Sequence, residues 1–219
     1  MDSLISTLAI WALPVLLAIT LHEAAHGYVA RHFGDPTADL AGRITLNPLR
    51  HIDPVGTILV PAGILALSSI AGAGGILFGW AKPVPVNFGR LRNPKADMLW
   101  VAAAGPFVNL LMAIGWAILF TIAAKSEPGA YTLPMLKMAD AGIQINAVLM
   151  ALNLLPIPPL DGGRIAVSLL PNRLAWRYAR LEPYGFPILL VLLFTGILGD
   201  ILWPLIAGFR YLLSIFFGF

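Results

Sequence analysis

The sequence predicts an all-α protein that crosses a membrane several times. The chain has 219 residues, of which 58% are hydrophobic and only 11% are charged, whereas a soluble globular domain carries about 25% charged residues. The mean hydropathy is +0.83. A membrane β-barrel would instead show alternating segments of about ten residues. We therefore expect one membrane-embedded domain over residues 1–219, with about four to six membrane segments of the length that a bilayer requires.

The first apolar run predicts a retained membrane helix. Residues 4–21 carry no charge, and the stretch has neither the basic start nor the small-residue cleavage site of a signal peptide. Helical character continues to about residue 33, where Gly34 and the pair Asp35-Pro36 predict the helix end.

Four further apolar runs follow. The run at 54–78 is rich in glycine and predicts a re-entrant loop or a tight hairpin. The run at 185–219 predicts either two short spans or one span plus an interfacial helix. Asp200 is expected to mark a turn within that last run. The four runs cover residues 54–78, 98–124, 139–155 and 185–219.

The charged residues lie mainly between these runs and predict the topology. Segments 31–53, 82–97 and 164–180 are basic, whereas 125–140 is nearly neutral. Cytoplasmic connections of membrane proteins carry an excess of Lys and Arg. The sequence therefore predicts a multi-pass protein of the cell membrane with the three basic segments in the cytoplasm. This distribution reports topology, and we expect no nucleic-acid partner.

Residues 22–26, HEAAH, place three ionisable groups at the end of an apolar helix. His22 and His26 are four residues apart and lie on one helical face, so both imidazoles can reach one Zn²⁺ ion. Glu23 points to a neighbouring position, where its carboxylate can accept a proton from water. Ionisable groups are costly at membrane depth and indicate a functional site by default. Without such a site they would have to reach the interface by snorkelling, which leaves their spacing unexplained.

A tetrahedral zinc site needs a further protein ligand. The chain has no cysteine, so the candidates are His32, His51, Asp161 and Asp200. Asp161 is favoured because it lies in the Pro- and Gly-rich stretch PIPPLDGG, and irregular backbone at membrane depth survives only where it lines a cavity or is buried in protein.

Three motifs together resemble the site-2 protease family of intramembrane zinc metalloproteases. They are HEAAH at 22–26, AAGPFVN at 103–109 and NLLPIPPLDGG at 153–163, in the family's order. GWAKPVPVN at 79–87 also resembles a segment of short prokaryotic members. The resemblance covers a three-helix catalytic core at about residues 4–165, followed by C-terminal membrane segments at about 185–219. The chain carries no stretch resembling a PDZ or nucleotide-sensing domain.

The resemblance implies a role for individual residues. His22, His26 and Asp161 would hold one Zn²⁺ per chain, and Glu23 would be the general base. Asn153 would bind substrate or polarise its carbonyl, since an amide can donate to a developing oxyanion without placing a charge in lipid. Asn109 is a further candidate for substrate binding, although this asparagine can also join helices, with Gly105 in the same motif allowing their close approach.

The function implied is intramembrane proteolysis. The enzyme would hydrolyse peptide bonds within or near transmembrane segments of a membrane protein, with its active site toward the cytoplasmic side of the bilayer. Residues 42–47 would form a β-like element that pairs with extended substrate. The alternative is a metal-ion transporter or another non-proteolytic metal-binding membrane protein. A transporter would show repeat halves, and the sequence shows none.

Overall fold

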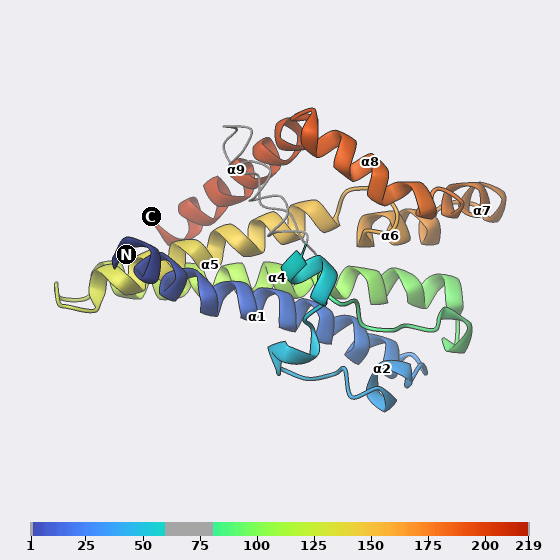
Figure 1. Ribbon diagram of the computed structural model, residues 1–219, viewed down its shortest axis with the longest axis horizontal. Helices are drawn as coiled ribbons and strands as arrows, with labels where there is room; N and C mark the ends of the chain where they lie inside the picture. The colour runs from blue at the N-terminus through green and yellow to red at the C-terminus, as the bar shows by residue number, and fades with distance from the viewer. Residues whose placement is uncertain (1, 60–80, 219) are drawn as a thin grey trace.

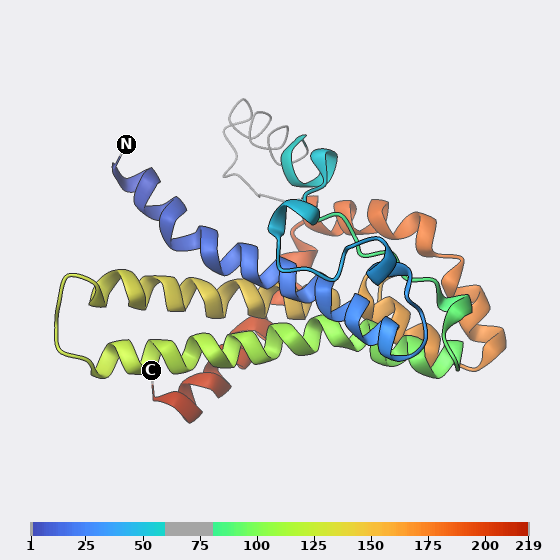
Figure 2. The same cartoon turned by 90° about the horizontal axis from the view of Figure 1, so that it is seen from below.

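The computed structural model describes residues 2–59 and 81–218. Three long helices form its centre: α1 (Asp2–His32), α4 (Pro94–Lys125) and α5 (Thr132–Asn153). Each of them packs against the other two, and they lie side by side in two perpendicular views (Figures 1 and 2). Helices α4 and α5 form an antiparallel hairpin that α1 crosses obliquely (Figure 2).

The part of the chain that the structure describes contains four helices long and apolar enough to cross a membrane. They are α1, counted from Ile5, together with α4, α5 and α9 (Ile197–Phe217). No strand is assigned in the described residues. The predicted all-α polytopic fold is therefore confirmed.

The end of α1 lies where the sequence predicts it. Its last residue is His32, and Gly34 follows with φ of 106°, a left-handed conformation that favours glycine. The N–H of Asp35 donates to the carbonyl of Ala30 at 2.9 Å and closes the last turn.

Helix α5 begins earlier than the sequence predicts. The apolar run suggested a start near residue 139, whereas α5 begins at Thr132. The stretch LKMAD at 136–140 carries Lys137 and Asp140, which favour a connection between helices, yet it forms helical turns. Hydropathy detects the apolar part of a helix, and a helix can continue beyond that part.

The connection between α1 and α4 is irregular. It contains α2 (Thr37–Leu40), the 3₁₀ helices η1 (Pro48–Arg50) and η3 (Phe88–Arg90), and the π-helical turn η2 (Pro54–Leu59). The re-entrant segment predicted at 54–78 lies largely outside the described residues.

Residues 42–47, predicted as a β-like element that pairs with substrate, contain a turn and bends in the described chain. Their polar groups are used locally: the hydroxyl of Thr45 accepts from the N–H of Asn47 at 3.1 Å, and the carbonyl of Thr45 bonds the His51 ring at 3.1 Å. Pairing of this segment with substrate stays a prediction.

The C-terminal part folds back on the hairpin. It begins with α6 (Asp161–Leu169) and α7 (Asn172–Ala179), and continues with the 13-residue α8 (Glu182–Phe194) and the longer α9. Two alternatives were predicted for residues 185–219. The structure agrees better with one long span, α9, accompanied by a shorter apolar helix, α8. Gly196, with φ of 82°, makes the turn, and Asp200 lies in the first turn of α9.

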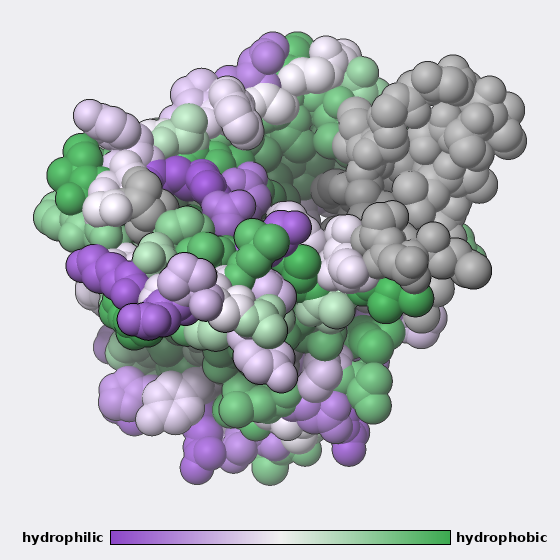
Figure 3. Space-filling model, turned by 90° about the vertical axis from the view of Figure 1, so that its left-hand side faces the viewer, coloured by the Kyte–Doolittle hydropathy of each residue, from purple (hydrophilic) through white to green (hydrophobic). Residues whose placement is uncertain are grey.

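Small residues let the long helices approach closely. The main buried cluster joins α4, α5 and α9, and a Cβ built at Gly142 would lie 2.3 Å from the ring of Trp116. The cluster consists of Ala113, Trp116, Ala117, Ala139, Ile143 and Leu213. At the end of the molecule where α4 and α5 are connected, hydrophilic and hydrophobic side chains are mixed on the surface (Figure 3).

Candidate metal centre

Three potential metal ligands from two distant segments meet between α1 and α6. The Nε2 atoms of His22 and His26 are 3.1 Å apart, and they lie 3.2 and 3.4 Å from Oδ2 of Asp161. All three side chains are largely buried. They form the one cluster of three metal-ligating side chains found in the described residues.

The helical spacing of α1 explains how the two histidines converge. Residues four apart lie one above the other on a helix, and the two imidazoles pack edge to face with ring centroids 4.7 Å apart.

Asp161 is delivered by a tight break in the chain. Helix α5 ends at Asn153, and α6 begins at Asp161 itself. A Cβ at Gly162 would lie 2.3 Å from the carbonyl oxygen of Leu154, and one at Gly163 would lie 2.4 Å from the nitrogen of Pro158. Both positions therefore require glycine, and this explains the Gly-Gly pair that follows the aspartate.

Gly105 provides the space beside the histidines. A Cβ at this position of α4 would lie 2.5 Å from Nε2 of His26 and 2.6 Å from Nε2 of His22. The sequence suggested that Gly105 allows close helix packing, and the structure shows what approaches it. The glycine of the AAGPFVN motif faces the nitrogen atoms that would bind metal.

Hydrogen bonds on the other side of each ring orient both histidines. Nδ1 of His26 lies 2.7 Å from the carbonyl oxygen of Val101, and Nδ1 of His22 lies 2.6 Å from Oδ1 of Asn109. A carbonyl oxygen can only accept, so each Nδ1 carries the proton. In the neutral tautomers each Nε2 therefore presents a lone pair, which is the arrangement typical of metal-binding histidines.

The donor set fits a tetrahedral cation. In a zinc site with bonds of 2.0–2.1 Å, neighbouring ligand atoms lie about 3.3 Å apart, and the three distances here are 3.1 to 3.4 Å. Oδ2 of Asp161 is buried and accepts no hydrogen bond. Three acceptor atoms that face one another in an apolar interior require a positive charge among them. Zn²⁺ satisfies this requirement.

The charge state of Asp161 suits a ligand. Burial raises the pKa of its carboxyl, but in the metal-free protein protonated imidazoles of His22 and His26 would supply hydrogen bonds and positive charge that outweigh burial and hold the pKa below its usual range. The group is therefore an ionised carboxylate at neutral pH, the form in which carboxylates bind metals.

Glu23 is held by the main chain of the α1–α4 connection. Its Oε2 accepts a hydrogen bond of 2.7 Å from the N–H of Val84. Val84 stands between Pro83 and Pro85, which have no N–H. Arg43 fixes the same segment because its guanidinium donates to the carbonyl of Lys82 at 2.8 Å. Segment 82–85 thus anchors the carboxylate beside the metal-binding histidines.

The remaining candidates have other environments. Nδ2 of Asn153 donates to the carbonyl of Leu149 at 3.0 Å within its own helix, and no described hydrogen bond joins it to the three ligands. His32 is exposed at the end of α1, and His51 is buried in the connection. Neither histidine belongs to the cluster, and Asp200 does not either.

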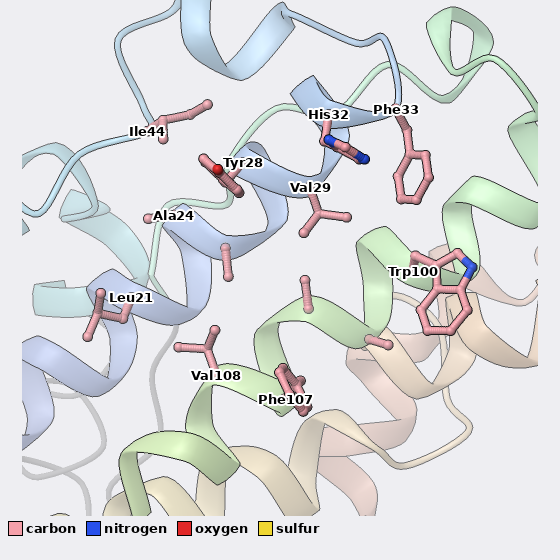
Figure 4. A pocket seen from close by; sticks show the side chains of 13 residues that line it. Leu21, Ala24, Tyr28, Val29, His32, Phe33, Ile44, Trp100, Phe107 and Val108 are labelled. Carbon is pink, nitrogen blue, oxygen red and sulfur yellow. The ribbon is translucent and has the colours of Figure 1, made fainter. Parts of the chain in front are cut away.

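An apolar groove of about 870 Å³ runs between α1 and α4 (Figure 4). Tyr28, His32 and Trp100 stand among its otherwise aliphatic and phenyl side chains. None of the three ligands lines it, and Glu23 does not line it either. The metal centre and the groove therefore occupy different sides of α1.

Asn146 of α5 is the site residue that sequence reasoning missed. It is fully buried and its Oδ1 accepts from Nδ2 of Asn109 at 2.9 Å, so it is one residue removed from His22. Its signal was present, because an amide in the middle of an apolar helix calls for the same explanation as any intramembrane polar group. Sequence reasoning also missed the N–H of Val84, which bonds Glu23, and the carbonyl of Val101, which bonds His26. These main-chain groups give no signal in a sequence.

Comparison with known proteins is consistent with these motifs. Residues 129–196 match the model of peptidase family M50. The chain is 40% identical over 206 residues to the "Putative zinc metalloprotease YwhC" of Bacillus subtilis, covering 92% of this chain and 88% of that protein. It is 31% identical to the "Putative zinc metalloprotease Rip2" of Mycolicibacterium smegmatis, covering 89% of this chain and 70% of that protein.

A search of solved structures gave no significant match. The sequence relationships are nevertheless extensive, since both relatives are at least 30% identical and are covered over more than two thirds of their length. The chain therefore belongs to peptidase family M50, the site-2 protease family of zinc metalloproteases, and it is a multi-pass membrane protein.

Proposed function

We propose that this protein is an intramembrane zinc endopeptidase that hydrolyses peptide bonds within or near transmembrane segments of other membrane proteins. The observation that carries the proposal is the convergence of His22, His26 and Asp161 on one point, with their acceptor atoms 3.1 to 3.4 Å apart. Two of the three come from α1, which is itself long and apolar enough to span a membrane.

These three residues would hold one Zn²⁺ per chain. Zinc, when bound, supplies Lewis-acid chemistry: it polarises a carbonyl and makes water more acidic. The metalloprotease names of the relatives support this assignment.

Glu23 is the proposed general base. Anchoring of its Oε2 by the Val84 N–H restricts the carboxylate without using its second oxygen. Glu23 accepts a proton as water adds to the carbonyl carbon of the scissile bond. It then returns that proton to the leaving nitrogen as the carbon–nitrogen bond breaks. Water and a peptide thus become one carboxylic acid and one amine.

Asn153 is the proposed substrate contact. It ends α5 at the break that leads to Asp161, and its amide is held only by a bond within its own helix. Asn109, by contrast, is fully buried and its amide is used inside the protein. We therefore propose that Asn109 orients His22 and does not touch substrate.

The site is proposed to face the cytoplasmic side of the cell membrane. Asp161 opens α6, which leads into the basic segment at 164–180, and α6 and α7 lie together at one end of the molecule (Figure 1). Lys95 at the start of α4 also reaches this end, where it donates to the carbonyl of Leu170 at 2.6 Å. Basic residues gathered at one end favour the cytoplasmic side.

The first experiment measures zinc per polypeptide in detergent-purified protein. We expect about one zinc in the wild type, which matches a single three-ligand site, and loss of zinc in His26→Ala and Asp161→Ala. His32→Ala is the matched control, because this histidine lies on the same helix outside the cluster, and it should keep its zinc. A wild type that binds no zinc when zinc is supplied would overturn the proposal.

The second experiment separates an enzyme from a metal-binding protein. Glu23→Gln should retain zinc and lose cleavage of membrane proteins that carry a single transmembrane segment, assayed in liposomes. A transporter would be unaffected by this change. Full cleavage by Glu23→Gln would contradict the proposed mechanism.

A further inference from the structure

Two fully buried asparagines connect α4 and α5 to the metal centre. Nδ2 of Asn109 donates to Oδ1 of Asn146 at 2.9 Å, and Oδ1 of Asn109 faces Nδ1 of His22 at 2.6 Å. Both side chains have no exposed surface. The mechanism above uses neither side chain on substrate, so their burial among membrane-spanning helices needs another explanation.

The hydrogen bonds form a series that runs from the carbonyl of Gly142 through Asn146 and Asn109 to His22. The carbonyl of Gly142 fixes which group donates in each of them. The carbonyl of Gly142 can only accept, so the group that Asn146 presents to it at 2.8 Å is Nδ2. Oδ1 of Asn146 must then face Asn109, which turns Nδ2 of Asn109 toward it. What remains for His22 is Oδ1 of Asn109, an acceptor. His22 therefore carries its proton on Nδ1 and leaves Nε2 free.

The hydrogen bond that keeps the proton on Nδ1 has a different acceptor in each of the two histidines. Nδ1 of His26 donates to the main-chain carbonyl of Val101, which cannot exchange its acceptor for a donor. His22 depends on a side-chain amide, which would be able to rotate by 180° and present NH₂ instead of oxygen if nothing held it. Two acceptors hold Nδ2 of Asn109: Oδ1 of Asn146 at 2.9 Å and the main-chain carbonyl of Ala18 at the longer distance of 3.3 Å. A rotated Asn109 would force the proton of His22 onto Nε2, where it would block metal binding.

We propose that Asn146 is a positioning residue that prevents this rotation. Asn146 makes the shorter of the two hydrogen bonds to Nδ2 of Asn109, and together with the carbonyl of Ala18 it fixes the acceptor for His22 and thereby the tautomer that can bind metal. The proposal rests on the metal site of the proposed function, but it concerns a residue of α5 that touches neither metal nor substrate.

Zinc affinity tests the proposal directly. The purified full-length protein is titrated with zinc against a chromogenic chelator, and cobalt is used in parallel because its visible spectrum reports the coordination. Losing a direct hydrogen-bond partner of a metal ligand costs about 10- to 100-fold in metal affinity. Asn146 acts through such a partner and shares its role with the carbonyl of Ala18, so Asn146→Leu should weaken zinc binding by about 10-fold, the lower end of that range. Asn146→Ala serves as a second variant if the leucine prevents folding, which gel filtration and circular dichroism would show.

A rescue experiment distinguishes orientation from packing. Asn109→Asp places oxygen at both positions of the side-chain terminus, so its rotation no longer matters. Combined with Asn146→Leu, it should restore the zinc affinity and the cobalt spectrum to those of Asn109→Asp alone. A packing defect at position 146 would not be repaired by this nearly isosteric change at position 109.

Asn153→Leu is the matched control. Asn153 lies two turns further along α5, and its amide donates only within its own helix. This variant should bind zinc as the wild type does, whatever it does to cleavage.

Two outcomes would overturn the proposal: wild-type zinc affinity in folded Asn146→Leu, or a zinc defect that Asn109→Asp fails to repair. Both differ from a failure of the proposed function, in which the wild type itself would bind no zinc.

Discussion

Two polar clusters lie within the membrane-spanning helices, and they differ in how their charges are balanced. At the metal centre, Asp161 and two imidazole nitrogens face one another as acceptors. At the other cluster, Arg210 of α9 donates to Asp140 at 2.6 Å and to Gln144 of α5 at 3.1 Å.

The difference shows what each cluster does. Arg210 brings its own counter-charge, so that cluster is complete and joins α9 to α5. The metal centre is complete only with a cation from outside the chain. A polar group in an apolar bundle therefore joins helices when its partners satisfy it, and indicates a binding site when they do not.

The largest expected effect comes from filling the space beside the histidines. Gly105→Ala places a Cβ about 2.5 Å from both imidazoles, so we expect loss of zinc and of all cleavage. Gly115→Ala on the same helix is the control, because nothing lies within 4 Å of its Cβ. Zinc per polypeptide measures both. Normal zinc content in Gly105→Ala would show that the ring positions at this site are incorrect.

Removing the donor that holds Glu23 should have the next largest effect. Val84→Pro deletes the N–H that bonds Oε2, and a misplaced catalytic group can cost about 100-fold in rate. We expect kcat to fall by about 10- to 100-fold with zinc content unchanged. Val84→Ala keeps the N–H and should retain activity. Equal loss in both variants would mean that the valine side chain matters, not its amide.

Removing the metal should lower the stability of the protein through the metal centre and not through the cluster of Arg210 and Asp140. If zinc binds the folded protein alone, at a free concentration 100 times Kd it adds about 2.7 kcal/mol to the free energy of unfolding. A chelator should therefore lower the Tm of the wild type, and zinc should restore it. In Asp161→Ala, neither addition should change the Tm; a chelator response there would mean that zinc stabilises the fold elsewhere.

The smallest effect is expected at the balanced cluster. Asp140 and Arg210 are partly exposed, and such ion pairs contribute about 0–1 kcal/mol. The double variant Arg210→Met with Asp140→Leu should keep its zinc and lose about 1 kcal/mol or less. Arg210→Met alone should lose a similarly small amount, because the half-exposed carboxylate of Asp140 stays hydrated without its partner. Loss of zinc in the double variant would link the two clusters.

The sequence predicted the parts of this molecule that depend on local pattern. Hydropathy located the long helices, Gly34 marked the end of α1, and the spacing of His22 and His26 placed both on one face. The absence of cysteine left four candidates for a third ligand. The Pro- and Gly-rich setting of Asp161 favoured this residue, and the resemblance to a family then implied the same ligand. The ligand roles themselves stay predictions until metal is measured.

The parts that failed depend on contacts between distant segments. Residues 42–47 look β-prone, yet the described chain shows a turn and bends there, because a strand needs a second segment to pair with. The amide of Val84 and the carbonyl of Val101 are main-chain groups that every residue possesses, so no letter in the sequence distinguishes them. Asn146 was visible as a polar residue in an apolar run, but only the fold shows that it faces Asn109.

The tight contact around Pro158 has a consequence for how the protein is made. A Cβ at Gly185 in α8 would lie 1.5 Å from the Pro158 carbonyl oxygen, so α8 closes directly over the loop that delivers Asp161. During synthesis, His22 and His26 leave the ribosome early, and α8 follows only after residue 182. The growing chain therefore carries all three ligands only after residue 161 has been made, and the loop that holds Asp161 gains its cover later still, when α8 has been translated.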